Sequence, residues 1–484
     1  NGVKKDISNF LEMRGDVPEP APTPDEPQPQ DFRRRRLVIF IDNAALHPFA
    51  RNAVLPHLHK FIEQHFRAGD ELTIVTWSPG LTTEVLAKNE TAALNVILRR
   101  MMMETTTATQ IDRDRYQQDL SELIAMYRRL DPPQNPPWDE GIGIIRSHAL
   151  RLLHEMRTKT EALKSVMTAM RGAEGRKILV LVTQGFASNP AEAMFAYLDS
   201  FRESFIGATN VAGDAREFDM PGLIEDIAQT ANSCGITLYP IDASGKLTDS
   251  ESLDAAFSKQ VSMARSTQVP QTIGHTLHGI ADATGGRALA GSSNFQLAFD
   301  TIGNDLTSYY SLGYRSSDER QDRMKSIEVR LKNKKYQLRS RRAVVERTVS
   351  TEMSDAVAAN LFRPIGTNDL KIVAKAGATG GIGELMMTVP VTITIPTSAL
   401  TLLPDGSDLT GRFSIFAAFV RNDGTVSKIA RQEQQFRFPA TSLERRKEIT
   451  VMLDVWADPQ TDGISIGVMD EASHATGFAS LKLR

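Results

Sequence analysis

The chain has 484 residues, of which 41% are hydrophobic and 24% are charged, and its net charge is -3. This composition is typical of a globular protein of roughly two or three domains, and it lacks the overall basic excess of a nucleic-acid-binding protein. No apolar run approaches the ~20 residues that span a bilayer, and the single cysteine, Cys234, excludes an internal disulfide and a cysteine zinc site.

The first 31 residues begin on Asn-Gly without an initiating methionine and continue into a stretch rich in Pro, Glu and Gln. The start predicts the end of an upstream segment that is missing here, and the Pro-rich stretch predicts an extended linker. We expect a folded domain from residue 32 to residue 347.

Strand and helix patterns alternate within residues 32–347. Continuous apolar runs predict buried strands at residues 37–42, 177–185 and 235–245, with helical spacing between them. Because strands separated by helices need crossover connections, we expect an α/β fold with a mostly parallel, helix-wrapped sheet. Prolines interrupt the helical pattern of residues 111–171, which predicts an inserted helical hairpin with Trp138 at its tip as a candidate partner contact.

The C-terminal part of the sequence is dominated by strand patterns. Residues 323–347 contain ten basic residues and predict a β hairpin around Asn333 and Lys334, which either attracts anions or protects a sheet edge. Residues 348–367 are expected to be a linker. Alternating apolar residues and turns in residues 368–484 predict an all-β, immunoglobulin-like sandwich.

A glycine-rich segment imitates a dinucleotide-binding loop. Gly377, Gly380 and Gly383 have the spacing of such a loop, but the alternating apolar residues of a strand follow where the motif requires a helix. We therefore expect a hairpin loop at these glycines.

Three other polar residues share one face of a predicted helix. His275, His278 and Asp282 are either a candidate metal site or an exposed polar face. The sequence contains no recognisable nucleophile elbow, phosphate loop or metalloprotease motif, and we expect no enzymatic activity.

Asp42 ends the first predicted strand, at the edge where open α/β sheets place their ligand sites. The order of elements and the sequence FIDNAAL at residues 40–46 resemble the von Willebrand factor A domain, whose metal-ion-dependent adhesion site reads Asp-x-Ser-x-Ser on this loop. The resemblance implies a Rossmann-like domain. Ala44 and Leu46 occupy the positions of the two serines, and Gln184 occupies that of a later aspartate. A threonine among residues 105–109 would supply the remaining hydroxyl.

These replacements remove oxygen ligands that a divalent cation would need. Mg²⁺ and Ca²⁺ require several oxygen ligands and usually carboxylate charge, so we expect a degenerate, metal-free site at Asp42 and no cofactor. Asp242, which ends the third strand, could compensate in part but matches no ligand of the family motif. Together with Asn43, Gln184 and Trp138, the two aspartates form the candidate interaction edge.

Several segments, most specifically residues 309–314 and the basic hairpin, resemble bacterial VWFA-related proteins that are abundant in Acidobacteria. That resemblance implies a secreted or periplasmic protein whose signal peptide precedes this chain. The sequence thus predicts a non-enzymatic interaction or envelope scaffold protein, with a protein or envelope component as partner. Two alternatives stay open: metal-dependent adhesion at Asp42, and an uncharacterised enzyme at the carboxyl edge of the sheet.

Overall fold

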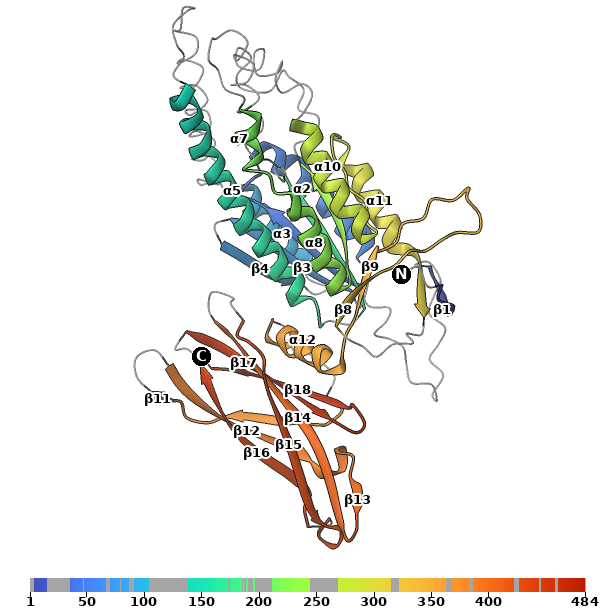
Figure 1. Ribbon diagram of the computed structural model, residues 1–484, viewed down its shortest axis with the longest axis vertical. Helices are drawn as coiled ribbons and strands as arrows, with labels where there is room; N and C mark the ends of the chain where they lie inside the picture. The colour runs from blue at the N-terminus through green and yellow to red at the C-terminus, as the bar shows by residue number, and fades with distance from the viewer. Residues whose placement is uncertain are drawn as a thin grey trace, which may run out of the picture. The chain divides into compact units, whose positions relative to one another are not determined.

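The computed structural model describes residues 4–14, 35–46, 48–66, 70–78, 80–86, 91–103, 138–172, 175–184, 186, 189, 195, 211–243, 269–314, 322–362, 368–382, 386–421, 426–443, 445–457 and 460–483. The chain divides into two compact units (Figure 1). The first unit comprises residues 1–167, 174–319 and 325–344, and the second comprises residues 168–173, 320–324 and 345–484.

A five-stranded sheet forms the centre of the first unit, in the order β4-β3-β2-β5-β6. Its strands are β2 (Arg35–Asp42), β3 (Glu71–Ser78), β4 (Gly80–Leu86), β5 (Arg176–Thr183) and β6 (Ile236–Asp242). All neighbours pair in parallel except β3 and β4. The central strands read as continuous apolar runs because both of their faces are buried.

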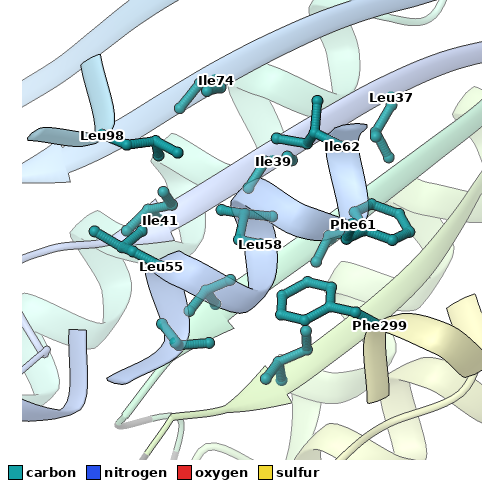
Figure 2. Close-up of a cluster of buried hydrophobic side chains, with 14 of the residues drawn as sticks. Leu37, Ile39, Ile41, Leu55, Leu58, Phe61, Ile62, Ile74, Leu98 and Phe299 are labelled. Atoms are coloured by element: carbon teal, nitrogen blue, oxygen red, sulfur yellow. The ribbon is translucent and has the colours of Figure 1, made fainter. Parts of the chain in front are cut away.

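Helices cover this sheet. They are α2 (Pro48–His65), α3 (Thr91–Met103), α5 (Trp138–Ala169), α7 (Ala212–Arg216), α8 (Pro221–Cys234), α10 (Val269–Thr284) and α11 (Phe295–Thr307). Side chains of α2, α3 and α11 pack with one face of the sheet; Figure 2 shows Leu58, Phe61 and Phe299 of this core beside Ile39 and Ile41. The first unit is therefore an α/β domain with a mostly parallel, helix-wrapped sheet, and the fold class predicted from the sequence is confirmed. No helix in the ranges given above is long and apolar enough to cross a membrane.

The N-terminal region belongs partly to this unit. Strand β1 (Ile7–Arg14) pairs antiparallel with β7 (Ser308–Tyr314), so the first 31 residues are not wholly an upstream end and a linker. The Pro-rich stretch at residues 15–32 lies outside the described residues. Of the expected helical insertion, α5 is present, whereas residues 104–137 are also outside the described part of the chain.

Two antiparallel sheets make up most of the second unit. One contains β10 (Val373–Ala376), β11 (Gly380–Ile382), β12 (Met386–Pro396) and β16 (Glu448–Ala457). The other contains β13 (Leu403–Asp405), β14 (Asp408–Arg421), β15 (Ala430–Pro439), β17 (Thr461–Asp470) and β18 (Thr476–Lys482). Buried side chains of β12, β14 and β17 join one apolar core, which confirms the predicted sandwich.

The expected linker at residues 348–367 is wrong for most of its length, because α12 (Val349–Phe362) occupies it. Met353 and Val357, four residues apart on α12, are buried with side chains of β14, β17 and β18. Gly467 allows this approach: a Cβ atom there would lie 2.5 Å from the side chains of both residues. Asn360 donates a buried 2.9 Å hydrogen bond to Ser465 of β17. Apolar burial thus orders this segment as a helix on the sheet.

Candidate functional site

The carboxyl ends of three neighbouring strands bring the central polar side chains together. Asp42 ends β2, Thr183 ends β5 and Asp242 ends β6. Thr183 and Asp242 are partners in the parallel register of β5 and β6. Because β2 lies beside β5, this edge has the position that the sequence assigned to the candidate site.

Asp42 is fully buried, and its carboxylate is bound by groups of this chain. Lys159 of α5 donates from Nζ to Oδ2 over 2.9 Å, and Thr183 donates from Oγ1 to the same oxygen over 2.6 Å. The backbone amide of Ala45 donates to Oδ1 over 3.2 Å. The positive charge next to this carboxylate is therefore the ammonium group of a side chain.

Lys159 is buried beside two aromatic rings. Only 2% of its side chain is exposed. Its Nζ atom lies 4.8 Å from the centre of the Phe186 ring and 5.9 Å from that of Trp77. Aromatic faces attract a cation through their quadrupole, so the two rings stabilise the ammonium that pairs with Asp42.

This arrangement does not fit the divalent cation of a metal-ion-dependent adhesion site. Mg²⁺ requires near-octahedral oxygen ligation, but Lys159 is bound to Oδ2 of Asp42 and would repel a second cation there. Leu46 does not supply a hydroxyl, and its side chain is buried in the apolar core. In the described ranges, no group of three or more His, Cys, Asp or Glu side chains is placed to hold a metal ion.

Asn43 is also buried, and it fixes the loop that follows β2. Its Oδ1 atom accepts a 2.9 Å hydrogen bond from Arg51 of α2, and its Nδ2 atom donates to Ser78 over 3.2 Å. Asp42 and Asn43 have no exposed surface, and they cannot contact a partner directly in this conformation. The predicted interaction edge needs correction at these two residues, because their polar groups bind the protein itself.

The other residues of the predicted edge differ in position. Gln184 is half-buried directly after β5, and Asp242 is 6% exposed at the end of β6. Trp138 begins α5, but its side chain lies outside the described part of the structure, as do residues 105–109. The structure thus brings Asp42 and Asp242 to one edge, and it describes no contact for Trp138.

Three charged side chains lie beyond this edge, and we call them the carboxyl rim (Arg146, Asp214 and Glu217). The side chains of Arg146 and Glu217 are exposed, and that of Asp214 is half-buried. Arg146 of α5 forms ion pairs of 2.8 Å with Asp214 and 3.0 Å with Glu217. Asn189, in the segment after β5, donates to the carbonyl oxygen of Ala215 over 2.8 Å and so ties α7 to this side of the sheet. The rim offers both signs of charge to a partner.

The structure also describes the polar face of α10 and part of the glycine-rich segment. His275, His278 and Asp282 are exposed on α10, as expected for a polar helix face. Gly377 donates its amide to Pro390 over 2.7 Å, and Gly380 lies in β11, which pairs with β12. The expected strand after the glycines is thus confirmed. The expected hairpin loop is wrong at Gly380, which lies in a strand, and Gly383 lies outside the described residues.

Lys159 is the residue that the sequence analysis missed. It lies on α5 three residues after Met156 and four before Leu163, both of which are buried. A lysine within the apolar stripe of an amphipathic helix must find a buried acceptor or a route to solvent. The position of this lysine in the apolar stripe could have been read from the sequence, but it does not show that Asp42 is the acceptor.

A second buried polar group occurs on β6. Burial and, as a smaller cause, the negative charge of Asp305, to which the phenol is hydrogen-bonded, together raise the pKa of the Tyr239 phenol to about 12. Asp305 also accepts two 2.6 Å hydrogen bonds from the guanidinium of Arg339. This group joins β6, α11 and the segment before β9.

Comparison with known proteins gives distant similarity. No protein-family model matches the chain, and no curated protein matches it. Among solved structures, an aerotolerance-related membrane protein from Bacteroides fragilis is 8% identical with a TM-score of 0.24, covering 56% of this chain and 98% of that one. Proximal thread matrix protein 1 of the mussel byssus is 11% identical with a TM-score of 0.21, covering 56% and 49%. The N-terminal domain of TFIIH p34 is 10% identical with a TM-score of 0.17, covering 52% and 99%.

Proposed function

We propose that this chain is a non-enzymatic, extracytoplasmic interaction protein that binds its partner without a divalent cation. The observation that carries the proposal is the Lys159 ammonium bound to Asp42 at the carboxyl edge of the sheet. An acidic group of a partner cannot complete the coordination of a metal where a side chain already supplies the positive charge.

The binding surface that we propose is the exposed carboxyl rim and not Asp42 itself. Asp42 is 0% exposed and Lys159 is enclosed by aromatic rings, so neither reaches a partner. The carboxyl rim is exposed on the same side, with Glu217 60% exposed and Arg146 42% exposed. Open α/β sheets bind their ligands outside the carboxyl ends of their strands, and this rim of helical residues lies on that side of the sheet.

The proposed location outside the cytoplasm rests on the resemblance of residues 309–314 and of the basic hairpin to bacterial VWFA-related proteins. The partner we propose is a protein or another component of the cell envelope. The non-enzymatic assignment rests on the same resemblance and on the use of the best-placed carboxylate, Asp42, as an internal ion-pair acceptor.

A crosslinking experiment on the whole chain tests the proposal. A photo-reactive amino acid replaces Glu217 on the carboxyl rim, and a control variant carries it at Lys60, which is exposed on α2. Envelope extract is irradiated in EDTA and, separately, in millimolar Mg²⁺. We expect one crosslinked partner from position 217, equal in both buffers and absent from position 60. Crosslinking that requires Mg²⁺, or that is the same from both positions, contradicts the proposal.

A further inference from the structure

The segment between β8 (Arg323–Ser326) and β9 (Ala343–Glu346) forms a projecting arm. We call residues 327–342 the basic arm; Figure 1 shows it as a long loop that extends past α11. The amide of Ile327 donates to the carbonyl oxygen of Arg342 over 2.9 Å, which closes its base. At its tip, Asn333 accepts a 3.0 Å hydrogen bond from the amide of Lys335, so a turn lies where the sequence predicted it. The predicted hairpin is wrong for residues 327–342, which form no strand, because only β8 and β9 pair at the base.

The base of the arm is fixed to the first unit. Arg339 forms two 2.6 Å hydrogen bonds with Asp305 of α11. Arg341 donates to the carbonyl oxygen of Gly235, and the amide of Arg342 donates to that of Ala283 over 3.2 Å. The tip is therefore presented from an anchored base.

The tip carries positive charge that the protein does not neutralise. Lys332, Lys334 and Lys335 are exposed, and they form no ion pair with any residue that the structure describes. Residues 331–338 contain no acidic residue. Arg330, by contrast, is bound to Glu328 through two 2.8 Å hydrogen bonds. Three free ammonium groups thus lie within four residues.

Apolar side chains accompany these lysines. Tyr336 is 71% exposed, and Leu331 and Leu338 are each 41% exposed. Every residue from 330 to 339 is exposed, so the tip is convex and nothing in the described structure covers its apolar groups. Leucine and tyrosine beside lysine are the side chains that insert at the headgroup boundary of a bilayer while the ammonium groups remain among the headgroups.

We propose that the tip of the basic arm binds the surface of an anionic lipid membrane. A convex tip can bring all of its side chains onto a flat bilayer at once, whereas it offers no cavity to a small anion. Lysines supply charge without the planar two-point contacts with which arginine recognises phosphates or bases. The single exposed aromatic at the tip, Tyr336, gives no stacking platform for successive bases of a single strand. This surface is separate from the carboxyl rim and goes beyond the proposed function.

Vesicle sedimentation of the whole chain tests the proposal. The vesicles contain either phosphatidylcholine alone or phosphatidylcholine with phosphatidylglycerol. We expect binding to the second kind only, weakened by salt. The triple variant Lys332→Gln, Lys334→Gln and Lys335→Gln should lower the partition coefficient roughly 100-fold, because each lysine near an anionic surface contributes roughly a fivefold factor. These residues are exposed, so circular dichroism should be unchanged.

Two further variants separate the membrane from other anionic partners. Tyr336→Ser with Leu338→Ser should weaken vesicle binding roughly tenfold, because the apolar contact is lost while the charge is kept. A matched control, Lys428→Gln with Lys447→Gln and Lys482→Gln, removes the same charge from exposed positions of the second unit and should bind like the wild type. No binding to anionic vesicles overturns the proposal. It is also overturned if the Tyr336 and Leu338 variant binds normally or if the control triple loses binding equally.

Discussion

Replacement of Lys159 by Met tests whether the ammonium supports the carboxyl edge. The side chains of Lys159 and Asp42 are 2% and 0% exposed, and 2.9 Å separates Nζ from Oδ2. In the variant, the donors to the Asp42 carboxylate that remain among the described residues are the Thr183 hydroxyl and the Ala45 amide. Removing one partner of a buried ion pair destabilises a protein by about 3–5 kcal/mol, because the other charge stays buried without compensation. We expect the free energy of unfolding of the first unit to fall by this amount.

Urea unfolding followed by the fluorescence of Trp77 measures this change, because Trp77 lies beside the ammonium. The other two tryptophans, Trp138 and Trp456, are replaced by Phe so that the signal reports the first unit alone. The matched control is Lys164→Met on the same helix. Lys164 pairs with the exposed Glu161 over 2.9 Å, and loss of such a surface pair costs at most about 1 kcal/mol.

A double-mutant cycle separates the ion pair from the loss of helix packing. Asp42→Asn with Lys159→Met removes both charges of this pair and leaves neither buried without its partner, so the double variant should be less destabilised than the sum of the two single variants. We expect a coupling free energy of about 2–3 kcal/mol, the upper range for residues in direct contact. Additive effects, or a Lys159→Met variant as stable as Lys164→Met, would refute the assignment of the ammonium as the charge partner of Asp42.

Three other predictions follow from the structure. Mg²⁺, Mn²⁺ or Ca²⁺ at millimolar concentration should leave the thermal unfolding of the wild type unchanged, and a melting temperature that rises with cation concentration would contradict this. Gly467→Ala should destabilise the second unit by about 1–3 kcal/mol, measured by urea unfolding, because its Cβ would lie 2.5 Å from Met353 and Val357. The raised pKa of Tyr239 keeps its phenol protonated in the folded chain, so wild-type stability should fall as pH rises from 10 towards about 12. Tyr239→Phe should remove this decline and, by loss of the hydrogen bond to Asp305, lower stability at neutral pH by about 1 kcal/mol.

The fold was largely predictable because its signals are local and repeated. The apolar run that ends at Asp42 is long enough to define a strand buried on both faces, and the alternation after residue 368 defines a sandwich. The helix at residues 349–362 was missed because its amino-acid composition does not distinguish it from a linker between two domains. The four-residue spacing of Met353 and Val357 indicates which face of the helix is buried. It does not indicate which sheet covers that face.

The sequence predicted the position of the candidate site, but it did not predict which side chain binds Asp42. The sequence located Asp42 at a strand end and showed that Ala44 and Leu46 could not act as hydroxyl ligands. It did not pair Asp42 with Lys159, which is 117 residues away, because such a pairing depends on how α5 lies across the sheet. Long-range charge pairs are set by tertiary packing, and no local periodicity encodes them.

A lysine ammonium beside Asp42 limits what the carboxyl edge can do, compared with a divalent ion. A divalent ion in an adhesion site keeps an open coordination position, so an acidic group of a partner can bind it directly. The ammonium of Lys159 is covalently attached, carries one charge and is enclosed by Phe186 and Trp77. It can neutralise Asp42 and so preserve the loop after β2, but it cannot exchange with solvent or bridge to a partner. Asp42 therefore acts as a structural residue, and the binding that we propose falls to exposed groups, those of the carboxyl rim and the basic arm.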